Sequence, residues 1–145
     1  MNEKNYDALL LEKQLCFPLY ACSREVIKRY RPYLDKLGLT YTQYIVLMVV
    51  WQEGTISVRD LGRRLHLDSG TLTPVLKHME QSGLITRRRC SADERVLLVT
   101  ITEKGMALRE DAVEIPAKLA GCARLDSEEM QTLHRLLNKI LNADA

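Results

Sequence analysis

The sequence lacks a long hydrophobic run. Its longest apolar stretch, Tyr44 to Trp51, is far shorter than the roughly 20 residues that a membrane-spanning helix needs. The first five residues are polar and of mixed charge, without the pattern of a secretory signal peptide. We therefore expect a cytoplasmic protein. Reducing conditions there argue against structural disulfides among its four cysteines.

Internal repeats, low-complexity tracts and long linkers are also missing. The chain has 145 residues, of which 46% are hydrophobic and 28% are charged, a composition typical of a globular protein. A chain of this length is large enough to bury a core. We therefore expect one domain that spans residues 1–145.

A strong net charge is missing too, because the formal value is only +2. The charge is nevertheless uneven along the chain. Residues 59–95 carry eight basic and five acidic side chains, whereas residues 96–145 carry six basic and eight acidic ones. A basic middle segment suits contact with nucleic-acid phosphates.

Two helix-start signals occur close together in the middle of the chain. Thr40 and Gln43 have the spacing of a capping box, and an apolar helix is predicted from there to about Glu53. The same spacing recurs in residues 57–60 and predicts a short helix through Leu65.

A third helix is predicted to begin at Asp68 or Ser69. Leu72, Leu76 and Met79 recur at helical spacing and must face the core. The opposite face offers small and polar side chains, namely Ser69, Thr71, Thr73, Pro74, Lys77, His78 and Gln81. Such side chains suit contact with base edges and phosphates in the major groove of DNA.

The sequence period then changes from helix to strand. Residues 84–89 and 96–101 predict two strands of a β-hairpin, separated by a polar loop. Three consecutive arginines on the first strand cannot all face one side, so at least one should lie along the stem. At the end of the loop, an Asp–Arg pair can brace the turn and aim the guanidinium at a minor groove. The hairpin thus adds four candidate DNA contacts: Arg87, Arg88, Asp93 and Arg95.

Helical segments flank this middle region. Residues 9–37 have apolar positions at helical spacing, with Pro18 and Pro32 each predicted to start, kink or end a helix. After the hairpin, Thr102 is predicted to cap another helix, and residues 126–129 form a capping box for the last one.

The order of elements is typical of a winged helix-turn-helix. Two short helices joined by a tight turn are followed directly by a basic hairpin. We therefore predict a mainly α fold with a small β-hairpin wing, in which the second short helix enters the major groove. The alternative interpretation is an ordinary solvated helix face in a helical bundle.

Residues 67–77, 83–85, 93–95 and 98–105 resemble the MarR family of bacterial repressors. The resemblance implies a homodimer on operator double-stranded DNA, with the N- and C-terminal helices at the interface. It implies a DNA-binding lobe at about 40–102, with arms at about 1–37 and 103–145. By the family pattern, Asp68, Ser69, Thr71, Thr73, Pro74 and Lys77 fall on the recognition helix, and Arg95 at the wing tip. His78 departs from the pattern, because close relatives carry an arginine there.

Residues 14–25 are similar to the organic-hydroperoxide-sensing branch of that family, the OhrR-like regulators. This resemblance implies that peroxide oxidises Cys16, and that Tyr20, Tyr30 and Tyr41 surround the sulfur. The chemistry is reasonable, since a sensor thiol must be reachable and thiolate-like, and phenols donate hydrogen bonds to an anion. The alternative for Cys16 is a small buried hydrophobic residue.

The other cysteines differ in what they suggest. Some OhrR-like proteins use a second cysteine, in the C-terminal region of the partner subunit, to form a disulfide with the oxidised sensor. Cys122 lies in the corresponding region and is a possible resolving residue, although other members pair the sensor with a small thiol. Cys22 and Cys90 are interpreted as bystanders.

The predicted function is a transcriptional repressor that releases operator DNA when an organic hydroperoxide oxidises Cys16. Two alternatives stay open. A repressor of the same fold could respond to a phenolic or other small ligand, and a thiol peroxidase would be an enzyme. The second is disfavoured because the sequence has no peroxidatic motif and its three histidines are scattered. We expect no enzyme activity, no metal site, no cofactor and no membrane association.

Overall fold

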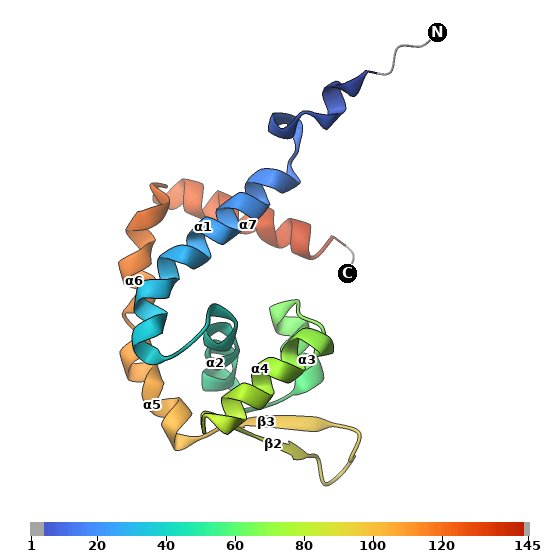
Figure 1. Cartoon of the computed structure of the whole chain (residues 1–145), viewed down its shortest axis with the longest axis vertical. Coiled ribbons are helices and arrows are strands. Elements are labelled where there is room, and N and C mark those ends of the chain that lie inside the picture. Colours follow the sequence, from blue (N-terminus) through green and yellow to red (C-terminus); the bar gives the residue numbers. More distant parts are fainter. Residues whose placement is uncertain (1–4, 144–145) are drawn as a thin grey trace. The chain divides into compact units, whose positions relative to one another are not determined.

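A computed structural model describes residues 5–143 and divides the chain after Val113 into two compact units. The first unit contains helices and a small sheet, and the second contains helices alone (Figure 1). The expected winged-helix class, mainly helical with a β wing, is confirmed.

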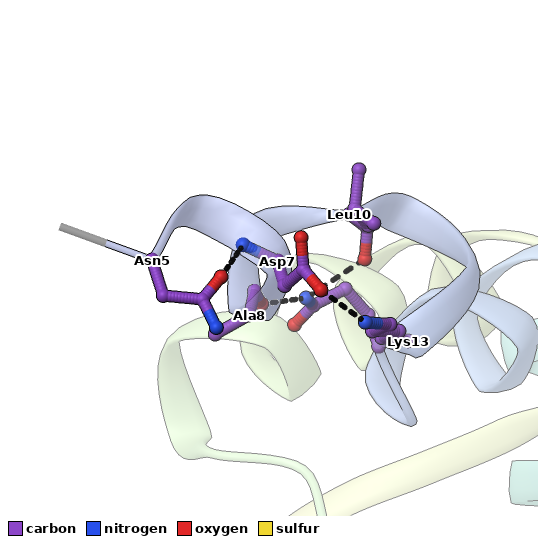
Figure 2. A network of polar contacts seen from close by, with 6 residues as sticks. Asn5, Asp7, Ala8, Leu10 and Lys13 are labelled. Carbon is purple, nitrogen blue, oxygen red and sulfur yellow. Dashed lines mark hydrogen bonds and ion pairs between the residues drawn. The ribbon is translucent and has the colours of Figure 1, made fainter. Parts of the chain in front are cut away.

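The chain enters the first unit through two short 3-10 turns, η1 (Tyr6–Leu9) and η2 (Leu11–Lys13). Asp7 joins them, because its backbone N–H donates to Asn5 Oδ1 and its carboxylate pairs with Lys13 Nζ at 3.1 Å (Figure 2). These bonds are local and exposed, so they order the turns without burying a core.

Helix α1 (Cys16–Leu34) runs without a break through both prolines. Pro18 lies in the first turn, where a missing N–H leaves no helical bond unmade. Pro32 lies in the last turn, and a short 3-10 turn, η3 (Asp35–Leu37), follows the helix. Gly38 then ends the segment in the left-handed region with φ of 66°. The prolines therefore lie within the first and last turns of one helix, whereas the sequence predicted that each would start, kink or end a helix.

Helix α2 (Tyr41–Glu53) forms the centre of the first unit. Its start is the predicted capping box, in which Thr40 and Gln43 bond reciprocally. Leu47 and Val50 on this helix are completely buried. Because α2 contacts α1, α3, α4 and α5, burial of its apolar side chains holds the surrounding helices in place.

Helices α3 (Val58–Leu65) and α4 (Ser69–Gln81) form the helix-turn-helix pair. Asp68 caps α4 through the backbone N–H of its third residue, as predicted. Ser57 caps α3, but the return bond of the predicted capping box is absent. The Asp60 carboxylate instead accepts from the Ser57 hydroxyl, because an Asp side chain is shorter than the Glu or Gln of a capping box.

The core of the lobe lies between these helices and the sheet. Leu72, Leu76 and Met79 on α4 are at most 1% exposed, which confirms the predicted inner face. Leu61 on α3 and Val99 on the sheet are completely buried as well. The position of α4 is therefore determined by apolar contacts along its whole length.

The sheet has three strands in the order β1-β3-β2, all antiparallel. β2 (Ile85–Arg89) and β3 (Leu97–Ile101) form the predicted hairpin (Figure 1). The third strand, β1 (Thr55–Ser57), was not predicted. It has only three residues, too few for an alternating pattern, and its pairing with β3 places Ile56 opposite Val99.

Helix α5 (Glu103–Ala112) begins at the predicted cap, Thr102. The Thr102 hydroxyl accepts from the Gly105 N–H and donates to the backbone near Leu84. A Cβ added at Gly105 would lie 2.1 Å from the Leu84 carbonyl oxygen, so only glycine fits there. Trp51 Nε1 donates to the Gly105 carbonyl at 2.8 Å, which joins α2 to α5.

The second unit contains α6 (Ile115–Ala120), a 3-10 turn η4 (Gly121–Ala123) and α7 (Ser127–Leu141). The predicted capping box at Asp126 and Glu129 is present at the start of α7. No residue of α7 is buried. Among residues 5–143, no helix is both long enough and apolar enough to cross a bilayer.

Candidate nucleic-acid interface and sensor cysteine

The outer face of α4 carries the side chains that the sequence assigned to DNA. All seven are exposed: Ser69, Thr71, Thr73, Pro74, Lys77, His78 and Gln81. The Thr73 hydroxyl donates to the Ser69 carbonyl at 2.7 Å, so its hydrogen is used and the oxygen can still accept from a ligand. Asp68 is exposed too, but its carboxylate oxygen is occupied by the helix cap.

The three arginines of β2, the first strand of the wing, differ in exposure and in their contacts. Arg88 and Arg89 are exposed, whereas Arg87 is half-buried against Glu80 of α4. Glu80 accepts from the Arg87 backbone N–H at 2.9 Å and from two guanidinium nitrogens at 2.9 and 3.1 Å. These hydrogen bonds hold the pKa of the Glu80 carboxyl below its usual value. The expected arginine along the stem is thus Arg87, which ties the wing to α4.

Arg95 extends from the loop between β2 and β3, with a side chain that is 91% exposed. Asp93 accepts from the Arg95 backbone N–H and from two guanidinium nitrogens, the shortest of these contacts being 3.1 Å. The same bonds lower the pKa of the Asp93 carboxyl. The predicted brace is confirmed, and it holds a guanidinium outside the lobe.

One residue behind the candidate interface was missed by the sequence. Gln43 on α2 is only 6% exposed, and its Nε2 lies 2.8 Å from Nδ1 of His78 on α4. The capping box identified Gln43 as a helix-start residue, but a partner 35 positions away has no local signal. His78 is therefore both exposed on α4 and attached to the helix behind it.

Cys16 is the first residue of α1 and is exposed. Because α1 is continuous, Tyr20 lies one turn along the same helix. The side chains of Leu15, Phe17 and Tyr20 are also exposed. The Tyr20 hydroxyl accepts from Arg24 at 3.4 Å. Within a single chain, Cys16 is therefore not the buried hydrophobic residue of the alternative interpretation.

The other two predicted tyrosines lie elsewhere in the chain. Tyr30 on α1 and Tyr41 on α2 make an edge-on contact at 5.1 Å, and Tyr44 joins them. Burial raises the pKa of Tyr41 and Tyr44, and Tyr30 adds to the effect, so these phenols stay protonated donors. Tyr30 is 14 residues beyond Cys16, a distance of about 21 Å along a helix. One chain therefore does not bring Cys16 and this cluster together.

The remaining cysteines differ in exposure. Cys22 on α1 and Cys122 in η4 are exposed, and Cys90 beyond the end of β2 is half-buried. Cys122 Sγ lies 4.0 Å from the Lys118 carbonyl oxygen. Within residues 5–143, no cluster of His, Cys, Asp and Glu has an arrangement that could hold a metal ion.

Comparison with known proteins identifies the family. Residues 28–112 match the model of the transcriptional regulators SarA/Rot. The chain is also 49% identical over 139 residues to the organic hydroperoxide resistance transcriptional regulator of Bacillus subtilis (strain 168), covering 96% of this chain and 95% of that one. The chain belongs to the SarA/Rot family of MarR-like transcriptional regulators. The resemblance seen in the sequence, including its organic-hydroperoxide branch, is confirmed.

Solved structures support the membership of this regulator family. A structure of reduced AbfR bound to DNA is 37% identical, with a TM-score of 0.77, and covers 92% of this chain and 93% of that one. A disulfide-formed AbfR is 35% identical with a TM-score of 0.67, covering 91% and 93% of the two chains. The likeness to AbfR thus extends over nearly the whole length of this chain.

Proposed function

We propose that this protein is a DNA-binding transcriptional repressor that acts as a homodimer in the cytoplasm. An organic hydroperoxide oxidises Cys16, and operator DNA is then released. The observation that carries the proposal is the joint presence of an exposed polar face on α4 and an exposed Cys16, in a chain 49% identical to an organic hydroperoxide resistance regulator. The role is regulatory and not enzymatic.

The DNA contact follows from charge and shape. The polar face of α4 enters the major groove, while Arg95 on the wing loop reaches the adjacent minor groove. Lys77 and Arg88 are exposed cations on these two elements and lie within reach of phosphates. The Glu80–Arg87 ion pair fixes the orientation of the wing relative to α4. The major-groove contact of α4 and the minor-groove contact of Arg95 therefore form together.

A second copy of the chain completes the sensor. The resemblance places three tyrosines around the sulfur, yet in one chain Tyr30, which contacts Tyr41, lies about 21 Å along α1 from Cys16. We infer that the tyrosine cluster of one protomer lies beside Cys16 of the other. Protonated phenols at that point donate hydrogen bonds to an anionic sulfur. The first turn of α1, with its free N–H groups, favours the same negative charge.

The oxidation step is a two-electron transfer. The Cys16 thiolate attacks one oxygen of the hydroperoxide, the S–O bond forms and the O–O bond breaks. The alkoxide leaves and takes up a proton to become an alcohol, and the sulfur is left as a sulfenic acid. A second thiolate then attacks the sulfenic sulfur, a disulfide forms and water leaves. That thiol is Cys122 of the partner subunit or a small cellular thiol.

Release of DNA follows from a change in the arms. Oxidation converts the Cys16 thiolate, which accepts hydrogen bonds from the phenols, into a sulfenic acid. The contacts between Cys16 of one protomer and the tyrosine cluster of the other must therefore rearrange. In a dimer the arms set the distance between the two α4 helices, and the spacing of DNA half-sites is fixed by the helical turn. A small shift in the arms therefore disturbs both half-sites together.

The test is DNA binding by reduced protein and by protein treated with cumene hydroperoxide. The Cys16→Ser variant should bind DNA as tightly as the wild type and should not respond to the peroxide. The matched variant Cys22→Ser, on the same helix, should still respond. Peroxide-driven release that persists in Cys16→Ser would overturn the sensor assignment. Release of this variant by a phenolic ligand would favour a ligand-controlled repressor instead.

The role of Cys122 is tested on non-reducing gels. If Cys122 resolves the sulfenic acid, peroxide should produce a disulfide-linked dimer in the wild type and none in Cys122→Ser. In that variant, release should be reversible by small thiols. If Cys122→Ser behaves as the wild type does, the protein uses an external thiol, and mass spectrometry of Cys16 should detect the mixed disulfide.

A further inference from the structure

His78 is held by a helix behind the candidate DNA surface. It lies on the exposed face of α4, one residue after Lys77 and one turn after Pro74. Its Nδ1 lies 2.8 Å from Nε2 of Gln43, which belongs to the first turn of α2. One ring nitrogen is therefore bonded inside the protein, and the other is directed away from that bond across the ring.

The direction of this hydrogen bond follows from the capping box. Gln43 Oε1 accepts from the Thr40 N–H at 3.0 Å, and Thr40 Oγ1 accepts from the Gln43 N–H at 3.2 Å. Because the amide oxygen is used in this way, the group that faces His78 is the NH₂. It can only donate, so His78 Nδ1 must accept. A neutral imidazole that accepts at Nδ1 carries its proton on Nε2.

We propose that His78 is a hydrogen-bond donor to DNA, whose Nε2–H contacts an acceptor on the duplex, and that Gln43 positions it by fixing the ring tautomer. This inference rests on the proposed DNA-binding function. The acceptor is a phosphate oxygen or a base-edge atom such as guanine N7 or thymine O4. Gln43 is almost fully buried, so the ring orientation is settled before DNA binds and little ordering is needed on binding.

The positioning role of Gln43 is tested by nitrogen NMR of the free protein. The spectrum is recorded at a pH about two units above the ordinary pKa of an imidazole. The wild type should then have the Nε2–H tautomer of His78. Gln43→Glu keeps an acceptor for the Thr40 N–H but offers only oxygens to His78, so the proton should move to Nδ1. A wild-type Nδ1–H tautomer, or an unchanged tautomer in Gln43→Glu, would overturn the assignment. A merely structural role of Gln43 would not move this signal.

The DNA contact is tested with a matched pair of substitutions. The amide nitrogen of glutamine reaches the position of histidine Nε2, whereas that of asparagine reaches only the position of Nδ1. The probe is a duplex that the wild-type protein selects from a random-sequence library. We expect His78→Gln to keep its affinity within about threefold and His78→Asn to lose about tenfold, as for one lost hydrogen bond. Equal affinity of both variants and the wild type would contradict the contact.

The same library distinguishes the two sources of the acceptor. If Nε2–H contacts a base, His78→Asn should lose selectivity at one position of each half-site. If it contacts a phosphate, the loss should be the same for every sequence. Failure of the proposed function has a separate signature, because the wild-type protein would then enrich no sequence. In that case the NMR experiment still decides whether Gln43 sets the tautomer.

Discussion

Helix α4, in the lobe predicted at residues 40–102, and helix α7 have the same apolar spacing but differ in burial. Leu72, Leu76 and Met79 on α4 recur at helical spacing and are at most 1% exposed. Leu133 and Leu136 of α7 belong to a similar apolar stripe, yet they are 41% and 44% exposed. Both helices also begin at a side-chain cap. Spacing thus identifies an apolar face, but it does not identify what covers that face.

The difference indicates two sources of stability. The lobe buries its apolar side chains against its own chain, so its folding should depend little on protein concentration. The α7 stripe is the kind of surface that a second copy covers in the proposed homodimer. Stability contributed there should rise with concentration. The following substitutions separate the two regions.

The largest effect is expected for Gly105→Ala on α5, at the contact of this helix with the lobe. The new Cβ would lie 2.1 Å from the Leu84 carbonyl oxygen and 2.6 Å from Cδ1 of Ile101. Backbone must move to relieve this contact, and we expect a loss of about 3 kcal/mol or more in unfolding free energy. Urea denaturation measures it. Gly121→Ala, where an added Cβ meets nothing within 4 Å, is the control and should be nearly neutral.

An effect of similar size, on association and not on unfolding, is expected for Leu136→Glu on α7. In a homodimer the substitution removes two buried leucines and adds two charges, so dimer association should weaken by about 3 kcal/mol or more. Analytical ultracentrifugation measures the association, and thermal melting should find the lobe folded. Gln131→Glu adds the same charge off the apolar stripe and should leave the dimer intact. An unchanged dimer in Leu136→Glu would place the interface elsewhere.

A third substitution tests the outer surface of the lobe. Arg95→Ala should weaken DNA binding by about 1–3 kcal/mol, because a wing guanidinium in a minor groove acts as one specific contact. Fluorescence anisotropy with the selected duplex measures the affinity. Arg89→Ala removes the same charge from the exposed end of β2 and should have a smaller effect. Equal losses in the two variants would mean that only the overall charge of the wing matters.

The smallest effect concerns the pair that joins the wing to α4. Arg87 lowers the pKa of the Glu80 carboxyl in the folded state below its ordinary value of 4.5. The pair therefore contributes stability above that pH and loses it as the pH falls through the folded value. Denaturation of wild type and Glu80→Gln from neutral to acidic pH should give curves that converge below about pH 4.5. Glu94→Gln, on the exposed loop, should not reproduce this convergence.

Much of the fold was predictable because its signals are local. The capping boxes at Thr40 and Asp126 and the cap at Asp68 were read from residues three positions apart, and each is present. The β2–β3 hairpin followed from alternation within six-residue segments. The short strand β1 was missed because three residues carry no period.

The candidate site was predicted only in part, because only some of its features have a local sequence signal. The exposed face of α4 and the Asp93–Arg95 pair were read from spacing within one element. The separation of Tyr30 and Tyr41 from Cys16 was not predicted, since it depends on the unbroken length of α1. The division of the chain into lobe and arms, and the individual DNA contacts, stay predictions.

By itself the sequence determined where the capped helices begin and which face of α4 is apolar, because each of these depends on neighbours within one or two turns. The tertiary structure decided how those elements constrain one another. Gln43 meets His78 across 35 residues, and Trp51 meets Gly105 across 54. Such pairs form only after the core has brought α2, α4 and α5 together. Their hydrogen-bond directions, and thus the chemistry that α4 offers to DNA, are set at that stage.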